Sequence, residues 1–126
     1  MARVLVVDDD SDIREGLHHL LASYGHSVTE AENGAVGLER LESTSVDLVL
    51  IDIVMPRMEG VETIMKIRRA RPGQKIVAMS GSDSKHSYLD FAMAFGADAV
   101  LSKPFQPAEL LETIGSVLTP DWQLQE

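Results

Sequence analysis

The 126-residue chain contains no cysteine. Disulfide bridges and thiolate metal sites are therefore excluded, and a reducing compartment is the simplest interpretation. The chain also lacks any apolar run of membrane-spanning length, and the apolar stretch within MARVLVVDDD is too short for a signal sequence. We therefore expect a cytoplasmic protein with no membrane association.

An excess of basic residues is lacking too. The chain has 20 acidic residues against 11 lysines and arginines, for a net charge of -9. This balance argues against general binding to nucleic acids or anionic membranes, and it favours a cation or a basic partner. No P-loop and no GxGxxG pattern is present, so the sequence predicts no cofactor-binding residues for a nucleotide.

Length and composition predict one globular domain. Apolar residues make up 44% of the chain and charged residues 25%, as in ordinary globular proteins. The length suits a single hydrophobic core. We expect the domain to cover residues 1–120, followed by a short tail over 121–126 and no output domain.

Five short runs with strand character alternate with helical patterns, which predicts an α/β fold with a parallel sheet. The first, third and fourth runs are almost continuously apolar, as in strands buried on both faces. The second is more polar and the fifth is very short, so we expect both at the edges. The predicted fold is a flavodoxin-like doubly wound sheet of order 2-1-3-4-5. The runs are 2–7, 27–31, 46–51, 75–80 and 99–102.

Five helices are expected between and after these strands. Their signals are apolar residues at helical spacing, with glycine or proline near the ends. The first helix should bury one stripe of side chains, formed by Ile13, Leu17, Leu20 and Leu21. The predicted helices cover about 12–24, 35–41, 60–70, 84–95 and 107–118.

Three consecutive acids end the first strand. Asp8, Asp9 and Asp10 carry negative charges that repel one another by roughly 4 kcal/mol per close pair at an effective dielectric near 20. Asp10 and Asp12 are suited to the N-terminus of the first helix. Because ligands bind at the carboxyl ends of the strands where the order reverses, a cation among these acids is the alternative explanation.

Three more polar side chains follow the other central strands. Asp52 comes after the third, Ser80 after the fourth and Lys103 after the fifth, so all should converge on Asp8 and Asp9. Clustered carboxylates suit Mg²⁺, with Mn²⁺ as the alternative. A carboxylate can accept a phosphoryl group as a nucleophile, while a hydroxyl and an ammonium stabilise the phosphoryl oxygens.

Four motifs in order carry a family resemblance: VVDDD, LIDIVMPRMEG, AMSGSD and GADAVLSKPF. They resemble the receiver domain of two-component response regulators over about 2–118, in the stand-alone form found in chemotaxis. The resemblance implies that Asp52 is the phosphoacceptor and a metal ligand. It implies that Asp9 binds Mg²⁺ directly, that Asp8 acts through water, and that Val54 offers its backbone carbonyl.

The resemblance also implies that Ser80 is the switch hydroxyl, that Lys103 contacts the phosphoryl group, and that the Lys103–Pro104 bond is cis. Two positions depart from the family pattern. Val100 replaces an aromatic residue that often changes rotamer with the switch hydroxyl, and valine lacks the size to swing between a buried and an exposed position. Val54 puts an apolar side chain where the family often has a polar one, which should alter the lifetime of the acyl phosphate.

The fourth helix has a wider apolar arc than one core-facing stripe requires. Phe91 and Met93 are candidates for exposure, and the alternative is that they only widen the core. Exposed, they would make the surface of the fourth helix, fifth strand and fifth helix a patch for a partner or a second copy. His18 and His19 have no accompanying acid or lysine pattern, so they are interpreted as solvated or packed histidines rather than as phosphohistidine sites.

The leading functional hypothesis is a single-domain receiver that a sensor histidine kinase phosphorylates with Mg²⁺. It would signal by a conformational shift and by binding a protein. Such a domain is not an enzyme, apart from its own phosphoryl transfer and autodephosphorylation. One alternative is a phosphorelay intermediate that passes phosphate to a histidine phosphotransfer protein. An aspartyl phosphatase of the haloacid dehalogenase type is disfavoured, because that class needs an Asp-x-Asp motif after its first strand and cap insertions.

Overall fold

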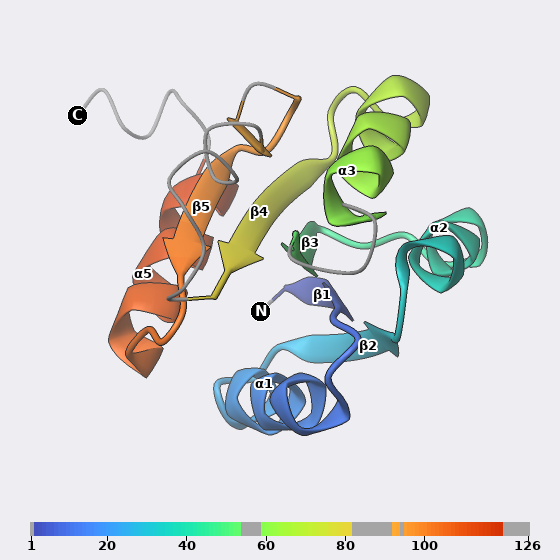
Figure 1. Ribbon diagram of the computed structural model, residues 1–126. Coiled ribbons are helices and arrows are strands. Elements are labelled where there is room, and N and C mark those ends of the chain that lie inside the picture. Colours follow the sequence, from blue (N-terminus) through green and yellow to red (C-terminus); the bar gives the residue numbers. More distant parts are fainter. Residues whose placement is uncertain (1, 54–58, 82–91, 94, 120–126) are drawn as a thin grey trace.

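The sheet contains five parallel strands in the order β2-β1-β3-β4-β5. The computed structural model describes residues 2–53, 59–81, 92–93 and 95–119. Figure 1 shows the sheet running through the middle of the molecule, with helices on both sides. The predicted flavodoxin-like order is therefore confirmed. The strands are β1 (Arg3–Val7), β2 (Ser27–Ala31), β3 (Leu48–Asp52), β4 (Lys75–Ser80) and β5 (Ala99–Ser102).

Four of the five expected helices lie within the described residues. The predicted helix over 84–95 falls mostly outside them, although Ala92 and Met93 are helical. No helix in the described part of the chain combines the length and apolar character needed to cross a membrane. The helices are α1 (Ser11–Ser23), α2 (Gly34–Ser43), α3 (Glu59–Ala70) and α5 (Pro107–Leu118).

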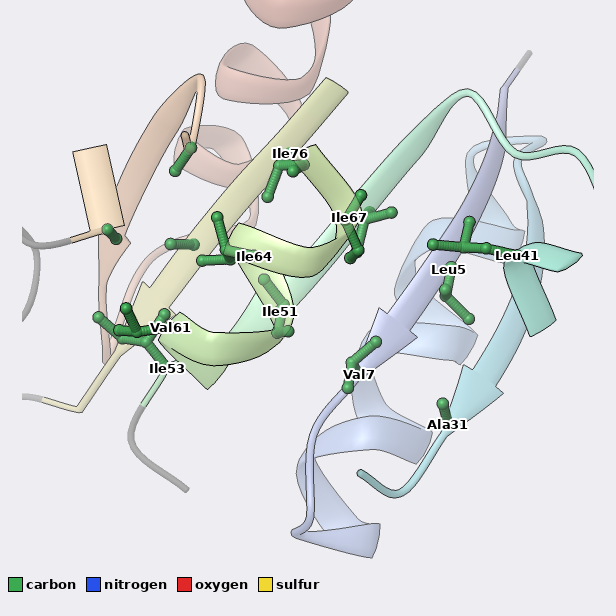
Figure 2. Close-up of a cluster of buried hydrophobic side chains, with 14 of the residues drawn as sticks. Leu5, Val7, Ala31, Leu41, Ile51, Ile53, Val61, Ile64, Ile67 and Ile76 are labelled. Atoms are coloured by element: carbon green, nitrogen blue, oxygen red, sulfur yellow. The ribbon is translucent and has the colours of Figure 1, made fainter. Parts of the chain in front are cut away.

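Two hydrophobic clusters, one on each face of the sheet, join the helices to the strands. Helices α2 and α3 cover one face, and the side chains of that cluster are drawn in Figure 2. Helices α1 and α5 cover the other face. Along β1, Leu5 and Val7 point to the first cluster, while Val4 and Val6 point to the second. This alternation explains why β1 is apolar throughout, as a strand buried on both faces must be.

Edge strands and central strands differ as predicted. All five residues of β3 are buried, whereas β2 has one buried residue and β5 has one. Burying a whole leucine or isoleucine side chain stabilises the fold by about 1.5 to 3 kcal/mol. The central strands therefore contribute more of the hydrophobic stabilisation than the two edge strands do.

Helix α1 corrects one expectation. Leu17 and Leu21 are buried, but Ile13 is 37% exposed and does not belong to the core. Ile13 lies in the first turn of α1, and three residues separate this turn from the end of β1. Only the later turns of α1 pack against the face of the sheet. The expected cap is confirmed: the Asp10 side chain accepts hydrogen bonds from the backbone N–H groups of Asp12 and Ile13.

Candidate functional site

The register of β1 and β3 puts two acids side by side. Val7 pairs with Ile51 in the parallel ladder, and the next residue of each strand is an aspartate. Asp8 and Asp52 therefore meet at the carboxyl edge of the sheet. Asp8 is fully buried and Asp52 is 6% exposed. Two buried carboxylates this close destabilise the fold unless positive charge or hydrogen bonds compensate them.

Lys103 supplies part of this compensation. Its Nζ atom lies 3.0 Å from Oδ2 of Asp8 and 3.3 Å from Oδ2 of Asp52. Burial disfavours the charged ammonium, but the hydrogen bond to Asp8 and the charges of Asp52 and Asp8 outweigh this effect. The net result is a pKa for Lys103 above its ordinary value of 10.5. Lys103 therefore stays positively charged at neutral pH.

The remaining atoms of Asp8 are also engaged. Its Oδ1 atom accepts a hydrogen bond of 2.9 Å from the backbone N–H of Asp10, so both carboxylate oxygens have partners. Asp9, between these two residues, is exposed. The turn after β1 thus presents one buried and one solvent-facing carboxylate from adjacent residues.

Asp8, Asp9 and Asp52 form a three-carboxylate cluster. One oxygen from each lies within 4.8 Å of the others. Two oxygens on opposite sides of a Mg²⁺ ion are about 4.2 Å apart, so the cluster fits this ion after a small inward movement. Lys103 offsets only one of the three negative charges. The remaining negative charge and the hard oxygen donors both suit Mg²⁺ or Mn²⁺.

Ser80 adds a hydroxyl that has no hydrogen-bond partner among the residues that the structure describes. Its Oγ atom is buried, and it makes no hydrogen bond within the described residues. Leaving a buried hydroxyl unpaired costs about 1 to 3 kcal/mol. Ser80 is the last residue of β4. Its carbonyl oxygen accepts a hydrogen bond of 2.6 Å from the backbone N–H of Lys103, so the backbones of the two residues are in contact. A ligand with acceptor oxygens would satisfy this hydroxyl.

The remaining predicted residues have mixed outcomes. The Lys103–Pro104 peptide is cis, as the resemblance implied. Val54 lies outside the described residues, so its carbonyl ligand stays a prediction. Val100 is partly buried and packs against the cluster beneath α2 and α3. Its role in switching stays a prediction.

The expected exposed patch is described only in part. Phe91 lies outside the described residues. Met93 is 49% exposed and Phe95 is 41% exposed, while Ala92 between Phe91 and Met93 is buried. The exposure of Met93 agrees with the prediction for the end of the fourth helix.

Sequence reasoning missed a glycine beside the site. A Cβ atom on Gly60 would lie 2.4 Å from the Cα of Ile53 and 2.5 Å from the carbonyl oxygen of Asp52. Only glycine lets α3 begin this close to the end of β3. The motif LIDIVMPRMEG contained this signal, since a glycine shortly after a strand often marks a close backbone approach.

A polar network behind the acids was also missed. Arg14 donates from Nη1 to the carbonyl oxygen of Asp8 at 2.8 Å and from Nε to Oε1 of Glu30 at 3.0 Å. The His18 ring nitrogen Nδ1 lies 2.6 Å from Oε2 of Glu30. The sequence around His18 did not indicate this acidic neighbour, because Glu30 comes from β2; the His18 side chain itself is 38% exposed, in agreement with its interpretation as a solvated or packed histidine. The available signal was Arg14 itself, a basic residue one helical turn after Asp10 and therefore close to the acids in the sequence.

Comparisons with known proteins agree with this geometry. Residues 4–115 match the family described as the response regulator receiver domain. Response regulator MprA of Mycolicibacterium vanbaalenii is 36% identical over 122 residues, which cover 94% of this chain and 52% of MprA. This chain thus spans about half the length of that relative. Chemotaxis protein CheY of Thermotoga maritima is 34% identical over 116 residues, covering 91% of this chain and 96% of CheY.

Solved structures show the same architecture. A CheY-like receiver domain protein from Methanospirillum hungatei superposes with a TM-score of 0.86 at 36% identity, covering 94% of each chain. Chemotaxis protein CheY4 of Vibrio cholerae gives a TM-score of 0.86 at 32% identity, covering 94% of this chain and 99% of CheY4. The strand order and the acids at the strand ends both agree with the family match. The chain belongs to the response regulator receiver domain family.

Proposed function

We propose that this receiver domain is phosphorylated on Asp52 in a Mg²⁺-dependent reaction, with a histidine kinase or a histidine phosphotransfer protein as donor. The observation that carries the proposal is the position of Lys103, whose ammonium contacts both Asp8 and Asp52 at the edge of the sheet. A lysine on the surface without a role in the site would extend into solvent instead of contacting two buried acids.

In the proposed reaction, a carboxylate oxygen of Asp52 attacks the phosphorus of a phosphohistidine. The new P–O bond forms as the P–N bond breaks, and the imidazole leaves with its electron pair and takes a proton from water. Lys103 would neutralise charge on the transferred group, and Ser80 would donate its unpaired hydroxyl to a phosphoryl oxygen. Both groups are positioned beforehand by the ends of β4 and β5.

The metal would be held by Asp9 and Asp52, with Asp8 acting through water and Val54 through its carbonyl. Mg²⁺ would supply a Lewis acid and would offset the negative charge that Lys103 leaves uncompensated. Its binding would also explain why three acids are gathered at one point. The protein's part is to hold the oxygens close together.

The output we propose is a change in protein binding rather than catalysis of an external reaction. Receiver domains act in signalling, and the chain aligns with nearly the whole of a chemotaxis receiver. The surface formed by Met93, Phe95, β5 and α5 is the proposed contact for a downstream protein or a second copy. We expect the Ser80 side chain to move when its hydroxyl binds the phosphoryl group. Val100 is too small for the aromatic rotamer change, so this movement should reach the surface through the backbone of β4 and β5.

A phosphate-release assay tests this function against the phosphatase alternative. The protein is incubated with a small acyl phosphate donor and Mg²⁺, and released phosphate is followed beside the amount of phosphoprotein. A receiver should accumulate phosphoprotein and release phosphate slowly. Release over many rapid cycles without accumulated phosphoprotein would contradict the proposal.

A further inference from the structure

Arg14 holds the peptide group that joins two of the proposed metal ligands. Its Nη1 atom donates to the carbonyl oxygen of Asp8 at 2.8 Å, and that carbonyl belongs to the Asp8–Asp9 peptide. The backbone N–H of Asp8 donates to the carbonyl oxygen of Ala31 in β2 at 3.1 Å. The backbone leading into Asp9 is therefore fixed at both polar groups of Asp8.

Glu30 and His18 in turn hold Arg14. Oε1 of Glu30 accepts from Nε of Arg14 at 3.0 Å, and Oε2 lies 2.6 Å from Nδ1 of His18. Since the pKa of Glu30 is lowered, chiefly by the hydrogen bond from His18, its side chain is a carboxylate and accepts from both neighbours. The Arg14 side chain is only 16% exposed. The guanidinium is thus oriented before any ligand binds.

We propose that Arg14 is a positioning residue for the metal pocket: held by Glu30, it fixes the Asp8–Asp9 peptide and so aims the Asp9 carboxylate at the cluster. This inference rests on the proposed Mg²⁺ site and deepens it. Arg14 itself does not touch the metal or the phosphoryl group, because its contact is with the backbone oxygen of Asp8.

Charge and position make opposite predictions for this arginine. A positive charge near the acids repels Mg²⁺, so if only charge mattered, Arg14→Gln would tighten Mg²⁺ binding and Arg14→Lys would leave it unchanged. A lysine keeps the charge but cannot reproduce the two-point contact of the guanidinium. A positioning role therefore predicts weaker Mg²⁺ binding in both variants.

The test is Mg²⁺ affinity by isothermal titration calorimetry, with urea unfolding in parallel. We expect the dissociation constant of each Arg14 variant to rise about tenfold, the lower end of the range for partners outside the ligand shell. Arg40→Lys and Arg40→Gln are matched controls, because Arg40 donates to the carbonyl oxygen of Glu30 at 3.3 Å rather than to Asp8. Both controls should keep the wild-type affinity.

A second readout needs no metal. The amide of Asp10 is hydrogen-bonded to Oδ1 of Asp8, so we expect its hydrogen exchange to quicken in Arg14→Gln and Arg14→Lys while that of Val49 in β3 is unchanged. Arg14 variants that unfold more easily yet keep wild-type affinity and Asp10 exchange would overturn the proposal. If the wild type binds no Mg²⁺, the metal part of the proposed function fails, and Asp10 exchange alone decides the role of Arg14.

Discussion

The ammonium of Lys103 lies 3.0 Å from the carboxylate of Asp8, although the two residues are 95 positions apart in the chain. This contact joins the residue that follows β1 to the residue that follows β5 across the carboxyl edge of the sheet. It brings one positive charge to a cluster that otherwise holds three negative charges.

Replacing Lys103 with methionine should lower the free energy of unfolding by about 3 kcal/mol without Mg²⁺, because Asp8 and Asp52 would lose their shared cation. Added Mg²⁺ should restore part of this loss by substituting for the missing charge. Urea unfolding of wild type and variant, with and without Mg²⁺, measures both effects. The control is Lys66→Met, an exposed position with the same charge change. Equal losses at both positions would refute the charge argument.

The pH dependence of this difference has a defined sign. The pKa of Lys103 is raised above 10.5 in the folded protein, so its stabilisation is complete below that pH and is lost as pH rises through the raised value. The stability difference between wild type and Lys103→Met should be constant from about pH 7 to 9 and should shrink only in strongly alkaline solution. A decline already between those two pH values would contradict the assignment.

Ser80→Ala should separate stability from phosphorylation. The Ser80 hydroxyl is buried and has no partner in the described part of the chain, so removing it should raise the free energy of unfolding by about 1 kcal/mol. The phosphorylated fraction at limiting phosphodonor should fall about fivefold, since one net hydrogen bond is worth about 1 kcal/mol. The exposed Ser116 gives a control in Ser116→Ala, which should leave the phosphorylated fraction unchanged. A destabilised Ser80→Ala would show that the hydroxyl does have a partner.

Gly60→Ala should destabilise the domain by about 3 kcal/mol, because the new methyl group would collide with the backbone of Ile53 and Asp52. Gly115→Ala makes the same chemical change in α5, where a Cβ meets nothing within 4 Å. It should stabilise the domain by about 0.5 to 1 kcal/mol. Thermal or urea unfolding distinguishes the two signs. Similar effects from both alanines would mean that α3 does not approach β3 as described.

Glu30→Gln should cost about 1 kcal/mol at neutral pH by weakening the contacts with Arg14 and His18. Because the pKa of Glu30 is lowered from 4.5, its stabilisation is present above that pH and is lost as pH falls through the lowered value. The difference from wild type should therefore shrink in acid. Glu39→Gln, on the exposed side of α2, is the control for unfolding measured as a function of pH. A difference that grows in acid would reverse the assigned sign.

The sequence predicted the sheet well because its signals are local. The polar run SVTEA and the short run AVLS marked the edge strands, and both bounds match β2 and β5. Once the order was known, the convergence of Asp8, Asp52, Ser80 and Lys103 followed from strand ends alone. The predicted burial of Ile13 was wrong, because helical spacing does not show how far the first turn of α1 extends beyond the sheet.

The contacts that position the site could not be predicted in the same way. Arg14 and Glu30 meet only because α1 packs beside β2, and neither spacing nor periodicity specifies which side chains face each other there. The closeness of Gly60 to Asp52 likewise depends on where α3 starts relative to the end of β3. Such contacts depend on three-dimensional packing, whereas the positions of the acids follow from where the strands end in the sequence.

Intact-protein mass spectrometry after treatment with a small phosphodonor and Mg²⁺ tests the central claim most directly. The wild type should gain the mass of one phosphoryl group. Asp52→Asn, in which the attacking carboxylate is replaced, should gain none under the same conditions. A wild-type chain that gains no mass while a known receiver is labelled in parallel, or an Asp52→Asn variant labelled as fully as wild type, would contradict the account.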